Sequence, residues 1–276
     1  MTYAVRSATV RFGDTLALDD VSLLVEPGSV VAVVGGDGAG KTTLLRALVG
    51  EVPLQRGEVD APPPEAIGYM PATAGSWLSL TVGQNMNFVG GIYGLSGDAL
   101  ATRRDALLDR AKLRMAVDRL SSQLSGGMRR KLGFSMAMVH DPPLLVLDEP
   151  STGIDPVSRV DLWRLVSEAA SAGAAVVMST TYLDEAERAA SLLALDGGRT
   201  LASGTLAEVL NSFSGAITRT ATPARRTWAW RRGREYHEYW PMTADMPLDA
   251  VAITPDLEDV VITLSMLKRH DREPAS

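Results

Sequence analysis

The sequence contains no cysteine, few aromatic residues and no long hydrophobic run. Phenylalanine, tryptophan and tyrosine together make up 5% of its 276 residues. Because cysteine is absent, a disulfide framework and a metal centre held by thiolates are both excluded. The longest apolar runs, such as residues 30–34, are far too short to cross a bilayer. We therefore expect any role at a membrane to depend on a partner protein.

The chain also lacks an excess of positive charge, because 33 acidic residues outnumber 27 basic ones and the formal net charge is -6 at pH 7. Binding to nucleic acid requires a basic surface that neutralises phosphates, so we expect no nucleic-acid partner. The first residues show no basic stretch followed by the apolar run of a secretory signal. This predicts a protein that is made and kept in the cytoplasm.

The composition favours a folded α/β protein. Hydrophobic residues make up 46% of the chain and charged residues 22%, which is enough for a packed core. Uniformly apolar stretches at residues 29–34, 144–147 and 174–179 predict buried strands. Residues 41–49 and 161–171 have the spacing of helices. Because strands and helices alternate, we predict a mainly parallel, doubly wound sheet.

The order of these patterns predicts two domains. The composition changes near Ser212, and we place the boundary there. Residues 1–212 would form the main domain, with a helical subdomain at about residues 80–140, and residues 213–276 a small accessory domain.

Within the helical part, we expect Gly90, Gly91 and Gly94 to interrupt the helical pattern of residues 80–120. In the accessory part, residues 227–240 alternate aromatic and charged side chains around Arg232 and Gly233, which predicts a hairpin, and residues 255–268 predict a helix with an acidic start.

The aromatic residues of this hairpin allow two interpretations. They could form a small core of their own or an interface with a partner, and the first is favoured because tryptophans usually cover a core. The residues concerned are Trp228, Trp230, Tyr236, Tyr239 and Trp240.

A glycine-rich segment joins the strand at residues 29–34 to the helix at residues 41–49. It matches the pattern G-x-x-x-x-G-K-[ST] in the strand–helix context that gives this pattern its meaning. Its members are Gly35, Gly36, Asp37, Gly38, Ala39, Gly40, Lys41, Thr42 and Thr43. The N–H groups of such a loop surround phosphate oxygens, and the helix N-terminus adds the positive end of its dipole. We expect Lys41 to reach the β- and γ-phosphates and Thr42 to bind Mg²⁺.

Two carboxylates end the strand predicted at residues 144–147. Asp148 is expected to hold Mg²⁺ through water, and Glu149 to polarise the water that attacks the γ-phosphate. Acidic residues at strand ends are common, so the pair is informative only together with the phosphate loop.

A third segment opens a helix about twenty residues before Asp148. It consists of Leu124, Ser125, Gly126, Gly127 and Met128. Ser125 is a good N-cap, and the small residues leave the helix N-terminus open as a second anion site.

In combination, the three segments resemble the nucleotide-binding subunit of ABC transporters, over roughly residues 3–210. Residues 179–187 and 254–259 are similar to the drug-exporter branch of the daunorubicin-resistance type. The resemblance implies a P-loop NTPase with a RecA-like core, a helical subdomain, an antiparallel N-terminal β subdomain and a small α+β C-terminal extension. It also implies an ATPase that drives a separate membrane permease when two such subunits close on ATP, at the cytoplasmic face of the membrane.

The resemblance also suggests roles for individual residues. The segment from Leu124 to Met128 would bind the γ-phosphate held by the opposite subunit, and residues 151–155 would form the loop that crosses to that subunit. Phe12 stands where the family stacks an aromatic ring on adenine; the simpler interpretation is a phenylalanine of the core.

Two positions depart from the family pattern. Ala72 follows Tyr69-Met70-Pro71 where the family usually has a glutamine, and the nearest glutamine, Gln84, is expected on a helix surface. Thr181 stands where the family has a histidine that contacts the γ-phosphate. The chain has three histidines, and none is near this place in the pattern; they are His140, His237 and His270. Threonine can donate a hydrogen bond but cannot carry a positive charge.

These departures predict that the chain's own site binds ATP well and hydrolyses it slowly. A heterodimer with a second, competent ABC subunit is favoured over a slow homodimer in which Thr181 and a water suffice. A soluble ABC ATPase of DNA repair or of the ribosome is the alternative function, but the chain has neither long coiled-coil heptads nor a second ATPase domain. The segment at residues 124–128 argues against a P-loop kinase or GTPase.

Overall fold

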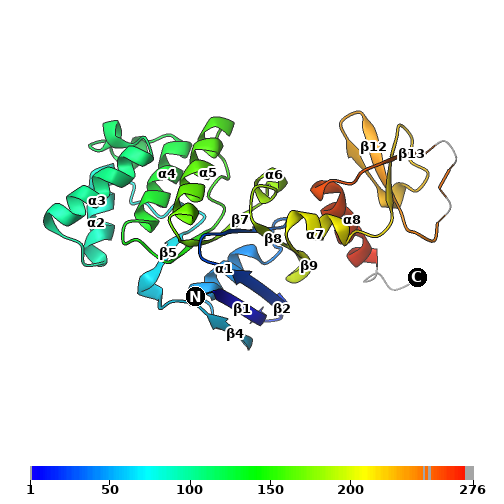
Figure 1. The fold of residues 1–276 in the computed structure, drawn as a ribbon, viewed down its shortest axis with the longest axis horizontal. Helices are drawn as coiled ribbons and strands as arrows, with labels where there is room; N and C mark the ends of the chain where they lie inside the picture. Colours follow the sequence, from blue (N-terminus) through cyan, green and yellow to red (C-terminus); the bar gives the residue numbers. More distant parts are fainter. Residues whose placement is uncertain (1, 245, 248–249, 271–276) are drawn as a thin grey trace.

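The computed structural model describes residues 2–244, 246–247 and 250–270 (Figure 1). Its centre is a six-stranded sheet of order β5-β6-β7-β3-β8-β9. Neighbours from β5 to β8 run parallel, whereas β9 is antiparallel to β8. The strands are β3 (Val30–Val34), β5 (Ile67–Met70), β6 (Leu144–Leu147), β7 (Ala175–Thr180), β8 (Ser191–Asp196) and β9 (Arg199–Gly204). The mainly parallel sheet confirms the α/β prediction.

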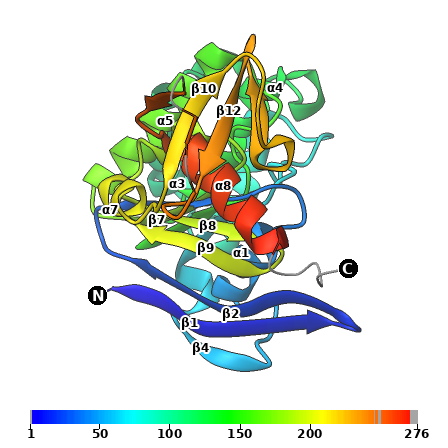
Figure 2. The ribbon, with the colours of Figure 1, turned by 90° about the vertical axis from the view of Figure 1, so that its right-hand side faces the viewer.

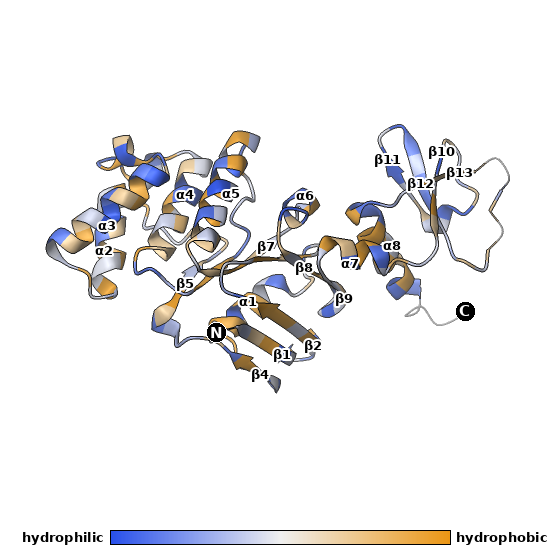
Figure 3. Cartoon of the chain, in the orientation of Figure 1, coloured by the Kyte–Doolittle hydropathy of each residue, from blue (hydrophilic) through white to orange (hydrophobic). Residues whose placement is uncertain are grey.

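Every residue of β3, β6 and β7 is buried, as expected for strands that are covered on both faces. Leu144 and Val146 pack on one face, in a cluster with α1 (Lys41–Leu48). Leu145 and Leu147 pack on the other face, in a cluster with α5 (Pro156–Ser171). β3 and β6 are apolar along their length and β7 is apolar up to Met178; β7 and β8 are coloured mainly as hydrophobic in Figure 3.

Helix α5 begins at Pro156, five residues before the predicted start at Asp161, so that boundary was wrong. The Asp155 carboxylate accepts a hydrogen bond from the backbone N–H of Ser158 at 2.9 Å and caps the helix. Proline at the first helical position needs no hydrogen-bond acceptor for its nitrogen. The Asp155-Pro156 pair is therefore the start signal that the apolar spacing alone did not reveal.

The N-terminal part forms an antiparallel sheet of order β2-β1-β4, below the central sheet in Figure 1. Its strands are β1 (Tyr3–Phe12), β2 (Thr15–Val25) and β4 (Arg56–Asp60). Val10 and Leu18 of this sheet join the same apolar cluster as α1, which seats the sheet beside that helix. This arrangement confirms the predicted antiparallel β subdomain.

The helical part consists of α2 (Val82–Ile92), α3 (Gly97–Arg110) and α4 (Gly126–Ala137). Gly90 and Gly91 lie inside α2, so the predicted break at these residues was wrong, and the helix ends before Gly94. A Cβ at Gly90 would collide with Leu100 of α3. A larger residue at this position would therefore require the Leu100 side chain to shift. Gln84 is exposed, as predicted, and completes the capping box of α2 with Thr81.

The C-terminal part contains a second antiparallel sheet of order β11-β12-β10-β13, and the last helix crosses one side of it (Figure 2). Its elements are β10 (Ala216–Thr220), β11 (Ala229–Arg232), β12 (Glu235–Trp240), β13 (Val251–Ile253) and α8 (Leu257–His270). The pairing of β11 with β12 confirms the predicted hairpin. Two short helices precede this sheet, α6 (Leu183–Ala186) and α7 (Leu206–Asn211).

The aromatic hairpin has a core of its own. Tyr239 and Trp240 are buried, and Trp228 lies within 5.8 Å of the Tyr239 ring. On strand β12 of the hairpin, Nδ1 of His237 lies 2.6 Å from the buried carboxylate of Asp259 on α8. These contacts support the interpretation of the aromatic residues as a small core.

Helix α8 also packs on the main part of the chain. Leu257 and Val260 share an apolar cluster with Ala32 and Val34 of β3. The boundary near residue 212 stays a prediction, but α8 clearly has contacts on both sides of it.

Single-turn 3₁₀ helices complete the fold at Pro64–Ala66, Arg114–Ala116, Ser121–Gln123 and Arg226–Trp228. Across the described residues, no helix has both the length and the apolar character needed to span a membrane.

Candidate functional site

The glycine-rich loop connects β3 to α1, as its pattern predicts. Gly40 caps α1 in a left-handed conformation with φ 103°, and a Cβ there would lie 2.8 Å from the Ala17 carbonyl oxygen. Only glycine fits this close approach of β2. Gly36, Asp37 and Gly38 are exposed at the tip of the loop. The exposed tip leaves room for a ligand on the loop.

Lys41 folds back across the loop. Its side chain is 5% exposed, and its Nζ donates hydrogen bonds to the carbonyl oxygens of Gly35 at 2.8 Å and Gly36 at 3.2 Å. The same atom lies 3.2 Å from Oε1 of Glu149. The structure thus brings the loop lysine and the strand-end carboxylate together, although they are far apart in the sequence.

The two predicted magnesium ligands are adjacent. The Thr42 hydroxyl donates to Oδ1 of Asp148 at 3.2 Å, and Asp148 is 1% exposed. A hydroxyl and a carboxylate are the oxygen ligands that Mg²⁺ prefers, and this ion usually takes its other ligands from waters and phosphates. The donor set therefore fits Mg²⁺.

Ser179 is a site residue to which the sequence analysis gave no role. Its hydroxyl donates to Oδ1 of Asp148 at 2.6 Å and accepts from the backbone N–H of Glu149 at 2.8 Å. A polar residue near the carboxyl end of a buried strand was the available signal, because β7 lies next to β6 in parallel register.

Glu149 has a strained backbone with φ 46°, which is uncommon for a residue other than glycine. Its Oε2 accepts a hydrogen bond from the Thr152 hydroxyl at 3.1 Å, while Oε1 faces Lys41. The carboxylate is thus held from both sides.

On the neighbouring strand β5, burial together with the charges of Asp148 and Glu51 raises the pKa of Tyr69 to about 12, so this phenol stays neutral.

Phe12 is 53% exposed, so it is not a core residue. It ends β1 in the hairpin that leads to β2, and Ala17 of β2 is the residue that approaches Gly40. The hairpin that carries the exposed ring therefore lies beside the phosphate loop.

The segment from Leu124 to Met128 opens α4 as predicted. The Ser125 hydroxyl accepts a hydrogen bond from the backbone N–H of Met128 at 3.3 Å and caps the helix. Gly126 lies near Gly153 and Ile154. The structure thus places this segment against residues 151–155, in the loop that follows Glu149.

The two positions that depart from the family pattern are both on the surface. Ala72 is exposed after β5, and its carbonyl oxygen accepts a hydrogen bond from Arg130. Thr181 is exposed directly after β7. The residue before it, Thr180, donates to the buried carboxylate of Glu185 at 2.5 Å.

Glu185 also accepts a hydrogen bond from Ser151 at 2.8 Å, so it connects the segment at Thr181 with the loop after β6.

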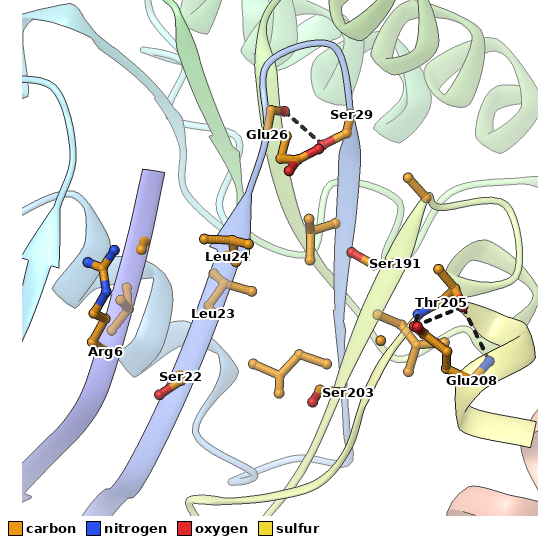
Figure 4. Close-up of a pocket in the computed structure, with 17 residues that line it drawn as sticks. Arg6, Ser22, Leu23, Leu24, Glu26, Ser29, Ser191, Ser203, Thr205 and Glu208 are labelled. Atoms are coloured by element: carbon orange, nitrogen blue, oxygen red, sulfur yellow. Dashed lines mark hydrogen bonds between the residues drawn. The ribbon is translucent and has the colours of Figure 1, made fainter. Parts of the chain in front are cut away.

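A cavity of about 570 Å³ lies elsewhere, between β2, β8 and the start of α7 (Figure 4). Its lining includes the apolar residues Leu23 and Val31 and the acidic residues Glu26 and Glu208. None of the predicted site residues lines this cavity. It is therefore separate from the candidate nucleotide site.

Comparisons with known proteins point to one family. The family model described as ABC transporter matches residues 18–152. The chain is 35% identical over 228 residues to the Nod factor export ATP-binding protein I of Cupriavidus metallidurans, covering 78% of this chain and 75% of that protein. It is 36% identical over 216 residues to the daunorubicin resistance ATP-binding protein DrrA2 of Streptomyces coeruleorubidus, covering 74% of this chain and 67% of that protein.

A third relative is longer. The probable multidrug ABC transporter ATP-binding protein YbhF of Escherichia coli is 37% identical over 201 residues, and the match spans 69% of this chain but 35% of that protein. Among solved structures, an ATP-binding subunit of an ABC transporter has a TM-score of 0.71 at 28% identity, covering 77% of this chain and 93% of the other.

Proposed function

The chain belongs to the family of ABC transporter ATP-binding proteins, and from this premise we propose that it is the ATP-binding motor subunit of a transporter whose membrane permease is a separate polypeptide. The observation that carries the proposal is the convergence of Lys41, Thr42, Asp148 and Glu149 at the carboxyl ends of β3 and β6. ATP hydrolysis requires phosphate-binding groups, a magnesium site and a water-orienting carboxylate close together.

In this proposal the residues divide the work of ATP hydrolysis. The loop N–H groups and Lys41 bind the phosphates, while the ring of Phe12 stacks on adenine. Thr42 and Asp148 hold Mg²⁺, which neutralises charge on the phosphate oxygens. Glu149 orients the attacking water and takes its proton. Because Lys41 pairs with Glu149 at 3.2 Å, ATP binding exchanges that pair for a lysine–phosphate contact.

Two subunits complete each other's sites. The helix N-terminus at Ser125 binds the γ-phosphate held on the partner's loop, and closure of the two subunits on ATP moves the permease. The names of the relatives, which include Nod factor export and daunorubicin resistance, support export as the direction of transport. The chain then works at the cytoplasmic face of the membrane, bound to the permease.

We further propose that the chain's own site is slow. Ala72 has no side-chain donor, and Thr181 cannot supply the positive charge of a histidine. Loss of one positioned donor commonly lowers the rate about a hundredfold. The chain would therefore pair with a second ABC subunit whose site is competent, in preference to a slow homodimer.

Calorimetry with Mg-ATP tests the assignment. We expect the unmodified chain to bind and Lys41→Ala to lose detectable binding, because the loop then lacks its phosphate-binding cation. Arg46→Ala is a matched control on the same helix, since Arg46 is half-exposed and its side chain pairs with Glu51. Equal affinity of Lys41→Ala and the unmodified chain would refute the nucleotide site.

Co-purification of a membrane permease with the tagged chain would distinguish a transporter subunit from a soluble ATPase.

A further inference from the structure

One arginine of α4 connects three segments around the candidate site. Arg130 donates through Nη1 to the carbonyl oxygen of Ala72, and through Nη2 to the carbonyl oxygen of Thr152 at 3.2 Å. Ala72 lies in the loop after β5, and Thr152 in the loop after β6. The side chain therefore ties both loops to the helix that begins with the Ser125 cap.

The contact with Thr152 leads directly to a catalytic group. The Thr152 hydroxyl donates to Oε2 of Glu149 at 3.1 Å, so a single residue separates Arg130 from this carboxylate. Burial lowers the pKa of Arg130, and the charges of Glu149 and Asp148 oppose that effect. The guanidinium thus lies within the electrostatic field of both carboxylates of the site.

The chemistry of the contact suits an arginine. A guanidinium presents several N–H donors in a rigid plane, so two of them can reach acceptors on different segments at once. Both acceptors here are backbone carbonyls, which any residue supplies. The connection therefore does not need a glutamine side chain at position 72, and alanine at that position leaves it intact.

We propose that Arg130 is a positioning residue for ATP hydrolysis, which holds the Ala72 loop and the Glu149–Thr152 turn in register with the helix that opens at Ser125. This inference rests on the proposed function. A nucleotide bound at the phosphate loop shifts Glu149 away from Lys41, and Arg130 passes that shift to the Ala72 loop and to α4.

Arg103 provides a matched control. It belongs to the same helical part, is 28% exposed at its side chain, and likewise donates to two backbone carbonyls, those of Met138 at 2.8 Å and Val139 at 3.2 Å. Both acceptors lie just after α4, away from the two loops that Arg130 connects. Arg103 also pairs with the Asp141 carboxylate at 2.7 Å, so its loss removes at least as many contacts without touching the proposed connection.

Hydrogen exchange on the full chain, with and without Mg-ATP, measures the connection independently of turnover. In the unmodified chain we expect Mg-ATP to protect amides of residues 35–43 and also of residues 71–76. Arg130→Met keeps a flexible, unbranched side chain, although a shorter one, and has no hydrogen-bond donor. It should retain the first protection and lose the second, whereas Arg130→Lys should retain the first and part of the second. Arg103→Ala should behave like the unmodified chain.

Single-turnover hydrolysis, with the chain in excess over Mg-ATP, gives the second readout. Arg130→Met should lower the rate about ten- to a hundredfold, as loss of an outer positioning partner does, with a Kd for Mg-ATP within about twofold of the unmodified chain. The hydrolysis rate of Arg130→Lys should lie between the rates of the unmodified chain and Arg130→Met.

The inference would be overturned if Arg130→Met kept the protection of residues 71–76 and hydrolysed ATP at the rate of the unmodified chain. If that variant does not fold, full protection and full rate in Arg130→Lys overturn it. A missing protection of residues 35–43 in the unmodified chain would instead overturn the proposed function, and this inference with it.

Discussion

Lys41 and Glu149 face each other across the site, with 3.2 Å between Nζ and Oε1. Each group satisfies the charge of the other in a largely buried position. A phosphate at Lys41 would compete with Glu149 for the ammonium, and the carboxylate would then be released toward a water. Under the proposed function, this ion pair would leave Glu149 free to act on a water only when a phosphate is bound.

The adenine contact can be tested at Phe12. Phe12→Ala should weaken Mg-ATP binding by about 1–3 kcal/mol, because a base stacked on an aromatic ring is worth that much. Isothermal calorimetry measures the change. Phe88→Ala is a suitable control, since Phe88 is similarly exposed at 48% but lies on α2. Unchanged affinity in Phe12→Ala would mean that another group holds the base.

The slow-site proposal can be tested at the two departures. The double variant Ala72→Gln plus Thr181→His should raise the rate of ATP hydrolysis by the isolated chain. Each restored donor should lower the activation free energy by about 1–4 kcal/mol. Both positions are exposed, so the larger side chains have space. The effects should exceed additivity, because both groups act on one water and one phosphate.

The two single variants are the controls for this test, and a steady-state phosphate assay measures the rates. Rapid hydrolysis by the unmodified chain would contradict the proposal, because the site would then need neither donor.

At the scale of elements, α4 carries two separate connections. Its N-terminus, capped by Ser125, lies against residues 151–155, and its next turn carries Arg130. The helix therefore contacts the loop that follows Glu149 at two levels. A rigid helix of this kind can carry a change at one site to a surface that serves another subunit.

Ser125→Arg tests the role of this helix end. The variant should lose ATP turnover in the assembled transporter, because a bulky cation blocks the N-terminus that receives the partner's γ-phosphate. The affinity of the isolated chain for ATP should stay unchanged. Loss of the helix cap should lower the free energy of unfolding by about 1 kcal/mol.

Ser96→Arg is the matched control for Ser125→Arg, because Ser96 opens α3 without a side-chain cap bond. Turnover in the reconstituted transporter and calorimetry of the isolated chain are the two measurements. A collapse of ATP binding in the isolated Ser125→Arg chain would show that the fold was damaged.

At the scale of the whole molecule, the central sheet connects the nucleotide elements with the C-terminal sheet. The phosphate loop follows β3, and Leu257 of α8 shares an apolar cluster with Ala32 and Val34 of that strand. Figure 1 shows the helical part and the C-terminal sheet at opposite ends of the molecule. The C-terminal sheet is therefore attached to the main part through packing as well as through the chain.

The pairing with a second subunit leads to a prediction for the assembled transporter. Glu149→Gln in this chain should lower transport less than the same change at the equivalent glutamate of the second ABC subunit, because the competent site would be built on the second subunit's loop. Transport into membrane vesicles measures both variants. If Glu149→Gln alone stops transport while the partner variant still transports, this chain's own site hydrolyses the ATP that drives transport. The proposal of a slow site paired with a competent second subunit would then be wrong.

The sequence by itself determined the family resemblance and much of the architecture. The phosphate loop, Asp148 and Glu149 were predictable because each motif is contiguous and parallel strands end at the same edge of a sheet. The Ser125 cap and the aromatic hairpin also follow from local patterns. The early start of α5 was readable from Asp155-Pro156, although apolar spacing alone missed it.

Only the tertiary structure decided which groups outside the motifs reach the site. Ser179 contacts Asp148 because β6 and β7 are neighbours, and Arg130 reaches Ala72 and Thr152 across 58 and 22 residues of chain. Gly90 lies inside α2, where the side chain of Leu100 on α3 packs against it. A local pattern encodes capping, turns and periodic burial, whereas these contacts depend on how whole elements pack, and packing is a property of surfaces that come from distant parts of the sequence.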